Sequence, residues 1–299
     1  MRNKKINGHL VAFVCGLLLV GVVACEKMRL SDNGSKQSEQ ADGQLVTVSV
    51  NSFEQIPFNS VTRAAVGDVC SRLNFIIYDD SGTRIRQVSQ TLEDEDFGQA
   101  RFNLSNGSYL LVVLAHSSSG NPTSTNPKKI AFSNSKGYTD TFLGTVSLTV
   151  NDEDIEKTLS LKRIVAKVRF VFDDAVPERA NRIRFYYTGG SGTLDATDSG
   201  WGSVNSTQIQ YYDLTHSERD FEIYTIPHGA EDKLKVTVNT YQGEAEDANI
   251  VTEREITDIP VLRNHITTCY GSLFAPVYKT NFKITIDDSW EVDSLDFQF

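Results

Sequence analysis

Short segments in which apolar and polar residues alternate recur along most of the chain. In the first of them, Val46, Val48 and Val50 lie on one side, and a period of two is typical of a half-buried β-strand. Turn-forming residues separate the segments, whereas no long stretch has the apolar spacing of three and four that an amphipathic helix needs. The sequence therefore predicts an all-β protein built from antiparallel sandwiches.

Two turns are specific enough to place strands around them. Residues 73–78 and 83–88 flank a turn at residues 79–82 (Asp-Asp-Ser-Gly), which predicts a β-hairpin. Residues 101–104 and 109–115 flank a second turn, which contains Asn106-Gly107. Further strand-like segments are residues 145–150, 181–187, 208–214, 221–226, 233–241, 250–257, 265–274 and 282–286.

The clearest strand is predicted over residues 162–172. Its apolar face consists of Ile164, Ala166, Val168, Phe170 and Phe172. Lys167 and Arg169 lie on the opposite face, so one face of this strand should meet solvent. An acidic break at residues 151–156 precedes it. We therefore expect an N-terminal sandwich domain over residues 44–156 and a C-terminal sandwich domain over residues 157–299.

The N-terminal residues have the features of an export signal. Arg2, Lys4 and Lys5 precede an apolar run over residues 10–24, which is short for a transmembrane helix of about 20 residues. The run ends in Val-Val-Ala before Cys25 and resembles a lipobox. We therefore expect a signal peptide over residues 1–24, a lipid on Cys25 and a flexible polar tether over residues 25–43. The alternatives are a plain secretory signal cut after Ala24 and an uncleaved membrane anchor.

The charge of the chain limits its partners. The sequence has 29 basic and 39 acidic residues, a formal net charge of −10. An acidic body without a basic stripe argues against nucleic acid and against docking on anionic lipid headgroups. The acyl chains on Cys25 would then supply the attachment to the membrane. Cys70 and Cys269 could form a disulfide in an oxidising compartment or remain as two buried free thiols.

Patterns of catalytic or metal-binding residues are largely missing. The sequence has neither an H-x-x-x-H pair in its body nor a C-x-x-C motif, and residues 189–193 (Gly-Gly-Ser-Gly-Thr) resemble a flexible loop more than a nucleophile elbow. Asp195 and Asp198 could bind calcium weakly, but a solvated turn fits them better. We predict no catalytic residues, no cofactor and no metal. A carboxylate pair for glycoside hydrolysis stays open, because its two residues meet only in the fold and leave no pattern in the sequence.

Three stretches resemble one family, the fimbrillins of Bacteroidales type V pili. Residues 261–266 (VLRNHI), followed by residues 270–274 (YGSLF), are similar to the family's V-x-R-N-H motif and the strand after it. Residues 161–172 (LKRIVAKVRFVF) resemble the strand that opens the family's second domain, and residues 191–208 resemble a mid-domain stretch of these subunits. From the residues alone, Arg263, Asn264 and His265 form a turn after Pro260 that leads into a strand.

The resemblance implies two transthyretin-like sandwiches that assemble with other fimbrial subunits by strand complementation. It implies an outer-membrane lipoprotein of the cell surface, either an anchor or an accessory or minor pilus component that contributes to adhesion. In polymerising pilins of this family a protease cuts after an arginine beyond the first strand, and Arg63-Ala64 lies at such a place. The alternative, which an anchor that keeps its lipid favours, is an exposed loop arginine that no protease uses.

Further alternatives remain open at the level of sequence, for the last segment and for the function. Residues 282–299 could be a donor strand for a neighbour or the last strand of their own domain. The protein could also be a glycan-binding lipoprotein of a nutrient uptake system, and a secreted hydrolase is a third possibility. Candidates for an aromatic sugar platform are Trp201, Tyr211, Tyr212 and Trp290.

Overall fold

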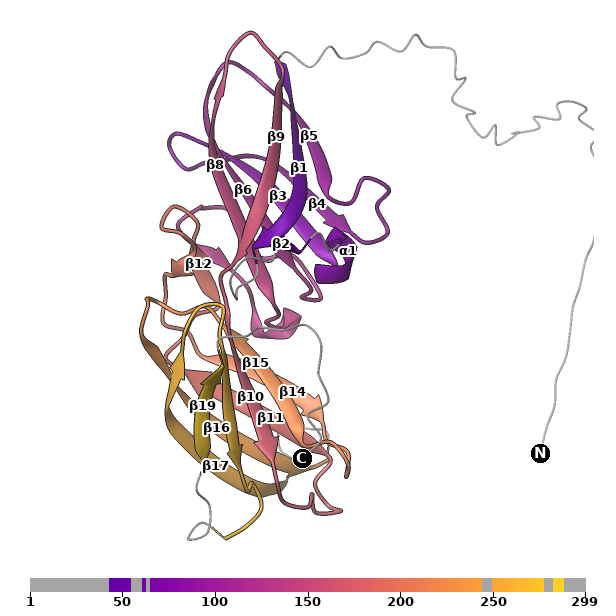
Figure 1. The fold of residues 1–299 in the computed structure, drawn as a ribbon, viewed down its shortest axis with the longest axis vertical. Coiled ribbons are helices and arrows are strands. Elements are labelled where there is room, and N and C mark those ends of the chain that lie inside the picture. The colour runs from indigo at the N-terminus through magenta and orange to yellow at the C-terminus, as the bar shows by residue number, and fades with distance from the viewer. Residues whose placement is uncertain (1–42, 55–60, 63–64, 244–248, 277–281, 288–299) are drawn as a thin grey trace, which may run out of the picture. The chain divides into compact units, whose positions relative to one another are not determined.

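The computed structural model describes residues 43–54, 61–62, 65–243, 249–276 and 282–287 (Figure 1). Over these residues the chain is almost entirely β-structure, with nineteen strands, one four-residue helix and one short 3-10 turn. The prediction of a mostly β protein is confirmed. Residues 42–299 form one compact unit. No helix in the described ranges combines the length and apolar character that crossing a bilayer would take.

Several predictions concern residues outside this description. The signal segment, Cys25 and most of the tether lie there, and so do Arg63, Ala64 and Trp290. The lipid attachment and the processing site therefore stay predictions from sequence.

Eight strands form the first sheet, in the order β2-β1-β9-β8-β6-β3-β4, with β5 paired to β1 outside this path. Their bounds are β1 Gln44–Glu54, β2 Val61–Thr62, β3 Arg72–Asp79, β4 Arg84–Thr91, β5 Gln99–Leu104, β6 Gly107–His116, β8 Thr141–Val150 and β9 Ile155–Arg163. The short helix α1 (Val66–Val69) precedes β3.

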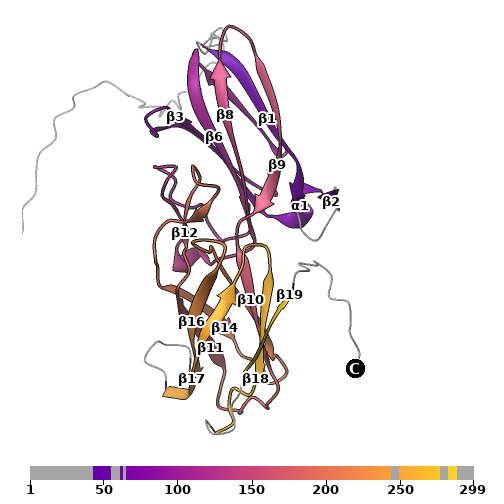
Figure 2. The ribbon, with the colours of Figure 1, turned by 60° about the vertical axis from the view of Figure 1, so that its left-hand side comes forward.

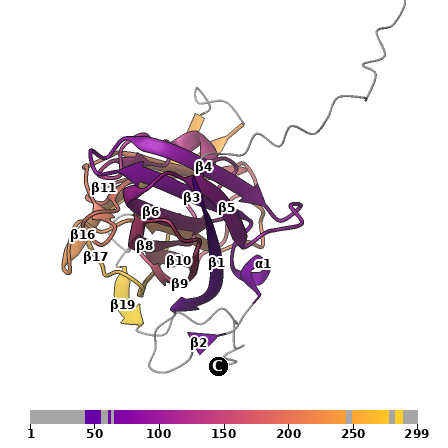
Figure 3. The same cartoon turned by 90° about the horizontal axis from the view of Figure 1, so that it is seen from above.

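β1 has strands on both sides. It pairs in parallel with β9 and antiparallel with β5 (Figure 3). Val46, Val48 and Val50 are buried as predicted, in a core that also holds Phe75 of β3 and Val113 of β6. β1 therefore contributes both backbone pairing and apolar burial to this part of the molecule.

The two predicted turns have different outcomes. β3 and β4 pair antiparallel around residues 79–82, so the first hairpin is confirmed. The Asn106-Gly107 turn does not close a hairpin, because β5 pairs with β1 whereas β6 pairs with β3 and β8. A turn dipeptide fixes the local reversal of the chain, but the burial of both strands selects their partners.

The predicted domain boundary, between residues 156 and 157, falls within β9. The acidic residues 151–154 form the turn between β8 and β9, and β9 then runs beside β1 as far as Lys162. The strand predicted over 162–172 is in fact two, because the chain leaves β9 at Arg163 and enters β10 (Ala166–Phe172) in another sheet. The inward-facing positions change phase here, from Leu161 and Arg163 in β9 to Ala166 and Val168 in β10, and consecutive buried residues mark the change of sheet. The division into two domains itself stays a prediction.

Two four-stranded sheets follow, in the orders β15-β10-β18-β19 and β14-β11-β16-β17 (Figure 2). Their bounds are β10 Ala166–Phe172, β11 Arg182–Thr188, β14 Gln208–Asp213, β15 Asp220–Thr225, β16 Asp232–Gln242, β17 Asn249–Val261, β18 Ile266–Gly271 and β19 Lys283–Asp287. The sheets pack face to face around one core, in which the ring centroids of Phe170 and Phe185 lie 4.9 Å apart. Lys167 and Arg169 face away from that core, as the alternation predicts.

A third core joins the first sheet to the later strands. Tyr78 of β3 and Val112 of β6 meet Val165, Leu194 and Ile226 there. A small sheet of β13 (Trp201–Gly202), β12 (Thr193–Asp195) and β7 (Ile130–Ala131) lies in this region, and the 3-10 turn η1 (Asn134–Lys136) follows β7.

Residues 189–193 are packed, which corrects the prediction of a flexible loop. Gly190, Ser191 and Gly192 are buried. A Cβ on Gly190 would lie 2.0 Å from the Thr225 hydroxyl, and one on Gly192 would lie 2.6 Å from the Tyr138 ring. The glycines are needed because the Thr225 and Tyr138 side chains lie too close to their backbone for a Cβ.

Candidate interaction site

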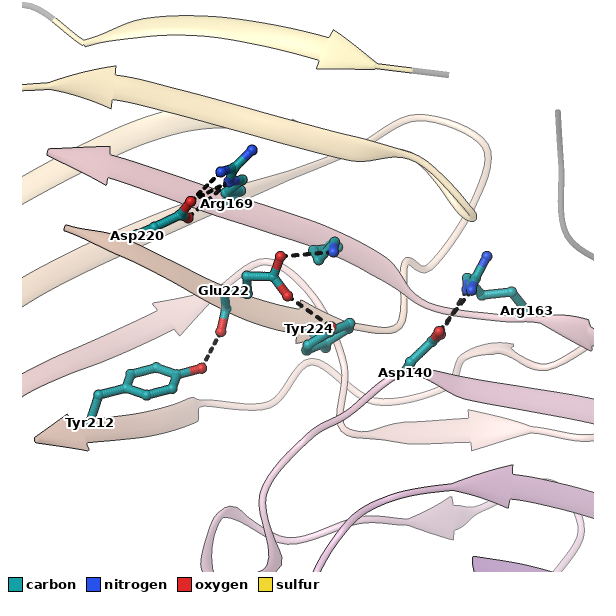
Figure 4. A network of polar contacts seen from close by, with 8 residues as sticks. Asp140, Arg163, Arg169, Tyr212, Asp220, Glu222 and Tyr224 are labelled. Atoms are coloured by element: carbon teal, nitrogen blue, oxygen red, sulfur yellow. Dashed lines mark hydrogen bonds and ion pairs between the residues drawn. The ribbon is translucent and has the colours of Figure 1, made fainter. Parts of the chain in front are cut away.

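The site is built around Arg163, the last residue of β9, whose side chain is buried. Its Nε and Nη2 each donate to one carboxylate oxygen of Asp140 at 2.7 Å (Figure 4), and its Nη1 donates to Asn264 Oδ1 at 2.8 Å. The guanidinium also lies over the Phe142 ring, 4.7 Å from its centroid. A buried arginine needs this degree of pairing, because an unpaired charge in the interior is very costly.

Asn264 is placed by the turn between β17 and β18. Its φ is 61°, in the left-handed region that asparagine tolerates better than most residues. The Asn264 N–H donates to Val165 O, and His265 N–H donates to Leu262 O. The turn predicted for Arg263, Asn264 and His265 is therefore confirmed, and its side chains do tie down the chain.

Arg263 precedes Asn264 in this turn, and its side chain has different partners. Its guanidinium stacks on Trp201, 3.5 Å from the ring centroid, and its Nη1 donates to Ser199 O at 2.9 Å. Burial lowers the pKa of Arg263 to about 10, against a smaller raising effect of Asp198.

A groove of about 580 Å³ opens beside these residues. The apolar or glycine positions in its lining are Leu143, Gly144 and Ile164. The polar positions are Glu54, Thr145, Ser160, Lys162, Arg163, Ser199, Arg263 and Asn264. Lys162 and Glu54 form an exposed ion pair across 3.3 Å. The groove therefore combines a partly apolar lining with charged and hydrogen-bonding groups, as sites for small ligands or peptide segments do.

A second polar network covers the outer face of β10 and β15 (Figure 4). Lys167 pairs with Glu222 at 2.8 Å, Arg169 pairs with Asp220, and Tyr224 donates to the other Glu222 oxygen at 3.1 Å. These pairs are partly exposed and neutralise one another. They give the sheet a polar surface and leave no reactive group.

The aromatic residues proposed as a sugar platform are engaged by the protein's own side chains. Arg263 covers one face of Trp201, and the Arg182 guanidinium lies 4.2 Å from the Tyr211 ring centroid. Tyr212 packs against the core of the face-to-face sheets and donates its hydroxyl to Glu222 O. Burial, followed by the negative charges of Glu222 and Glu218, raises the pKa of Tyr212. These three side chains do not form one open platform.

The aspartates considered as weak calcium ligands, Asp195 and Asp198, lie at a turn, and Asp195 accepts hydrogen bonds within it. Asp195 Oδ1 accepts from both the N–H and the hydroxyl of Thr197, at 2.8 and 2.6 Å, and Asp198 is exposed. Asp154 of the β8–β9 turn accepts from Leu45 N–H. Over the described residues, no group of three or more His, Cys, Asp and Glu side chains is arranged to hold a metal ion.

Cys70 and Cys269 are both free and buried. They lie in different cores, that of the first sheet and that of the face-to-face sheets. Of the two alternatives, the structure contains the free thiols. Burial raises the pKa of each to about 12, so neither thiol ionises near neutral pH.

The Asp140–Arg163–Asn264 network was not predicted from the sequence. One signal could have indicated it, because Arg163 occupies an inward-facing position two residues after the buried Leu161. Its partners lie 23 and 101 residues away in the chain, and no local pattern identifies them.

The family model described as a family of unknown function (DUF6562) matches residues 38–298. Among curated proteins, none matches the sequence. The chain is similar over most of its length to fimbrial and adhesin proteins of Bacteroidales, so the predicted resemblance is confirmed.

Three solved structures illustrate the similarity. The fimbrial anchor protein Mfa2 of Porphyromonas gingivalis is 12% identical with a TM-score of 0.49, over 82% of this chain and 98% of that one. A candidate adhesin of Bacteroides ovatus is 14% identical with a TM-score of 0.48, over 72% and 82%. The tip fimbrial protein Mfa3 of P. gingivalis, with a C-terminal truncation, is 13% identical with a TM-score of 0.37, over 82% and 99%.

Proposed function

The chain belongs to the family of unknown function DUF6562, and from that premise we propose that it is a lipid-anchored fimbrial subunit of the outer membrane. In this proposal it is an anchor or an accessory component, it has no enzymatic activity, and its partners are other fimbrial subunits. The lipid on Cys25 holds it at the cell surface, where it contributes to adhesion.

The observation that carries the proposal is the contact between the two segments that resemble fimbrillins most. Arg163 belongs to the segment 161–172 and Asn264 to the segment 261–274, and their side chains meet at 2.8 Å in the interior. The strands that follow them, β10 and β18, pair in parallel over Lys167↔Ile266 to Phe172↔Gly271. The two motifs therefore form one structural unit, which supports a common origin for the resemblance.

The place of β1 supports assembly by strand complementation. β1 lies beside β9 and β5 and buries Val46, Val48 and Val50. A molecule without β1 would expose an apolar groove and two rows of unpaired backbone groups, and an extended segment of a partner could restore both.

Mass spectrometry of the mature protein from native cells tests the proposal. We expect an N-terminal Cys25 that carries acyl chains, with no cut at Arg63-Ala64, because an anchor has to keep its lipid. In the Cys25→Ala variant the protein should leave the membrane fraction. An N-terminus at Ala64 would instead identify a processed pilin, and unchanged membrane retention of the variant would exclude the lipid as the anchor.

Association with fimbrial subunits is tested separately. A tagged copy expressed in its native cells should co-purify with other fimbrial subunits. Recovery of the protein without any fimbrial subunit, together with glycan-array binding that is lost in Trp201→Ala, would favour the glycan-binding alternative.

A further inference from the structure

The groove beside Arg163 contains one guanidinium, that of Arg263, that has no carboxylate within ion-pair distance among the described residues. Asp140 pairs with Arg163, and Glu54 pairs with Lys162. Arg263 is the third cation of the groove, and among the described residues its guanidinium has one hydrogen bond, to a neutral carbonyl of Ser199. Asp198 acts on Arg263 without an ion pair in contact, so the Arg263 end of the groove holds a cation that no carboxylate contacts.

Three nitrogen donors at that end have no hydrogen-bond partner among the described residues. They are Nε and Nη2 of Arg263 and Nδ2 of Asn264. Asn264 is 5% exposed, so its amide is cut off from water as well. A buried donor without an acceptor destabilises the protein, and such groups indicate a missing acceptor.

The shape of the groove favours an extended peptide. β8 and β9 pair at only two positions, Phe142↔Arg163 and Leu143↔Lys162. Beyond them the described residues show no pairing between the two strands, and Gly144, Thr145 and Ser160 line the groove. The groove thus lies where the pairing of two strands ends, and facing strand edges are the surroundings in which an extended segment finds backbone partners.

From these observations we propose that the groove binds an extended acidic segment of a partner protein, whose carboxylate is bound by Arg263 and Asn264. This inference rests on the proposed function, because it names the chemistry of a segment in a neighbouring subunit. In the free protein Nε and Nη2 of Arg263 are buried where the guanidinium stacks on Trp201. As the segment binds, its carboxylate accepts hydrogen bonds from the Arg263 guanidinium, which turns away from the indole ring.

The movement of Arg263 gives the test an optical signal. The chain has two tryptophans, so a Trp290→Phe background leaves Trp201 as the reporter. The probes are a blocked extended hexapeptide with one central glutamate and the same peptide with glutamine in its place. We expect the glutamate peptide to change Trp201 emission and to bind at least about tenfold more tightly, because hydrogen bonds to an ionised acceptor are the stronger ones.

Two variants separate the site from general folding. Arg263→Gln should abolish the preference for glutamate. Asn264→Asp keeps an acceptor for Arg163 and a residue that tolerates the left-handed turn, but it replaces the amide donor by a negative charge, so it should also remove the preference. Lys128→Gln, which removes an exposed positive charge outside the groove, should leave the preference unchanged.

Equal affinity for the two peptides, or a preference that survives in both Arg263→Gln and Asn264→Asp, would overturn the inference. Binding of an oligogalacturonate in place of the peptides would also overturn it, by assigning the groove to an acidic glycan. If the peptide assay fails while fimbrial subunits still co-purify, this inference alone is wrong. If the glutamate peptide binds more tightly but no fimbrial subunit co-purifies, the proposed function is wrong and the inference about the groove stands.

Discussion

Arg163 keeps its charge in the interior because Asp140 and Asn264 together accept three of its hydrogen bonds. Replacing Asp140 by alanine would remove a carboxylate and two hydrogen bonds from a guanidinium whose side chain is 1% exposed. We expect Asp140→Ala to lower the free energy of unfolding by about 3–5 kcal/mol. Urea denaturation of the wild type and the variant measures the difference.

The matched control is Asp220→Ala, which removes the carboxylate from Arg169. Both side chains of that pair are more than two-fifths exposed, so water replaces the partner and the loss should stay below about 1 kcal/mol. Equal losses in the two variants would show that burial of Arg163 does not matter for stability.

His116 is a second buried polar residue, with a predictable effect of pH. Ser118 N–H donates to its Nδ1, so Nε2 carries the proton and donates to Asn74 Oδ1 at 2.9 Å. Burial, followed by the positive charges of Arg72 and Lys136, lowers the pKa of His116 from 6.5 to about 4. The folded protein therefore holds a neutral imidazole where the unfolded chain is already protonated.

The sign follows from proton uptake. As the pH falls from 6.5 towards 4, the unfolded chain binds a proton at His116 that the folded protein does not bind. The contribution to stability is complete above pH 6.5 and is lost as the pH falls, by at most about 3 kcal/mol. Thermal unfolding between pH 7 and pH 4 should show this slope, and His116→Gln should reduce it. An unchanged slope in the variant would assign it to other groups.

Among the elements, the glycine-containing stretch before β12 depends most on the absence of a side chain. Gly190→Ala would place a Cβ 2.0 Å from the Thr225 hydroxyl, whereas a Cβ on Gly229 would meet nothing within 4 Å. We expect Gly190→Ala to destabilise the protein by about 1–3 kcal/mol, the range for overpacking, and Gly229→Ala to change stability by less than about 0.5 kcal/mol. A melting temperature of Gly190→Ala equal to that of the wild type would contradict this packing.

At the level of strands and turns, part of the fold could be predicted from the sequence. β1, the β3–β4 hairpin and the outward-facing Lys167 and Arg169 follow from local alternation and turn chemistry, and all are confirmed. The division between β9 and β10 was missed, although the three consecutive apolar residues Ile164, Val165 and Ala166 interrupt the alternation there. The network around Arg163 could not be predicted, because its partners come from loops distant in sequence, and only the fold brings them together.

At the scale of the whole molecule, the shared core decides whether the sheets unfold together. Tyr78 of the first sheet packs in one cluster with Ile164, Val165 and Ile226, and residues 42–299 form one compact unit. Two tandem domains joined only by a linker would be expected to unfold independently. A common core instead couples them, so we expect one cooperative transition.

Cys70 and Cys269 report on this coupling, because one buried thiol lies in the core of the first sheet and the other between the face-to-face sheets. Thiol labelling at increasing urea, with each site identified by peptide mass spectrometry, should give the same midpoint for both. Ile164→Ala removes a side chain that is 1% exposed in the shared core, at a cost of about 2–5 kcal/mol. It should lower both midpoints together, whereas a shift of one midpoint alone would show that the sheets unfold as separate domains.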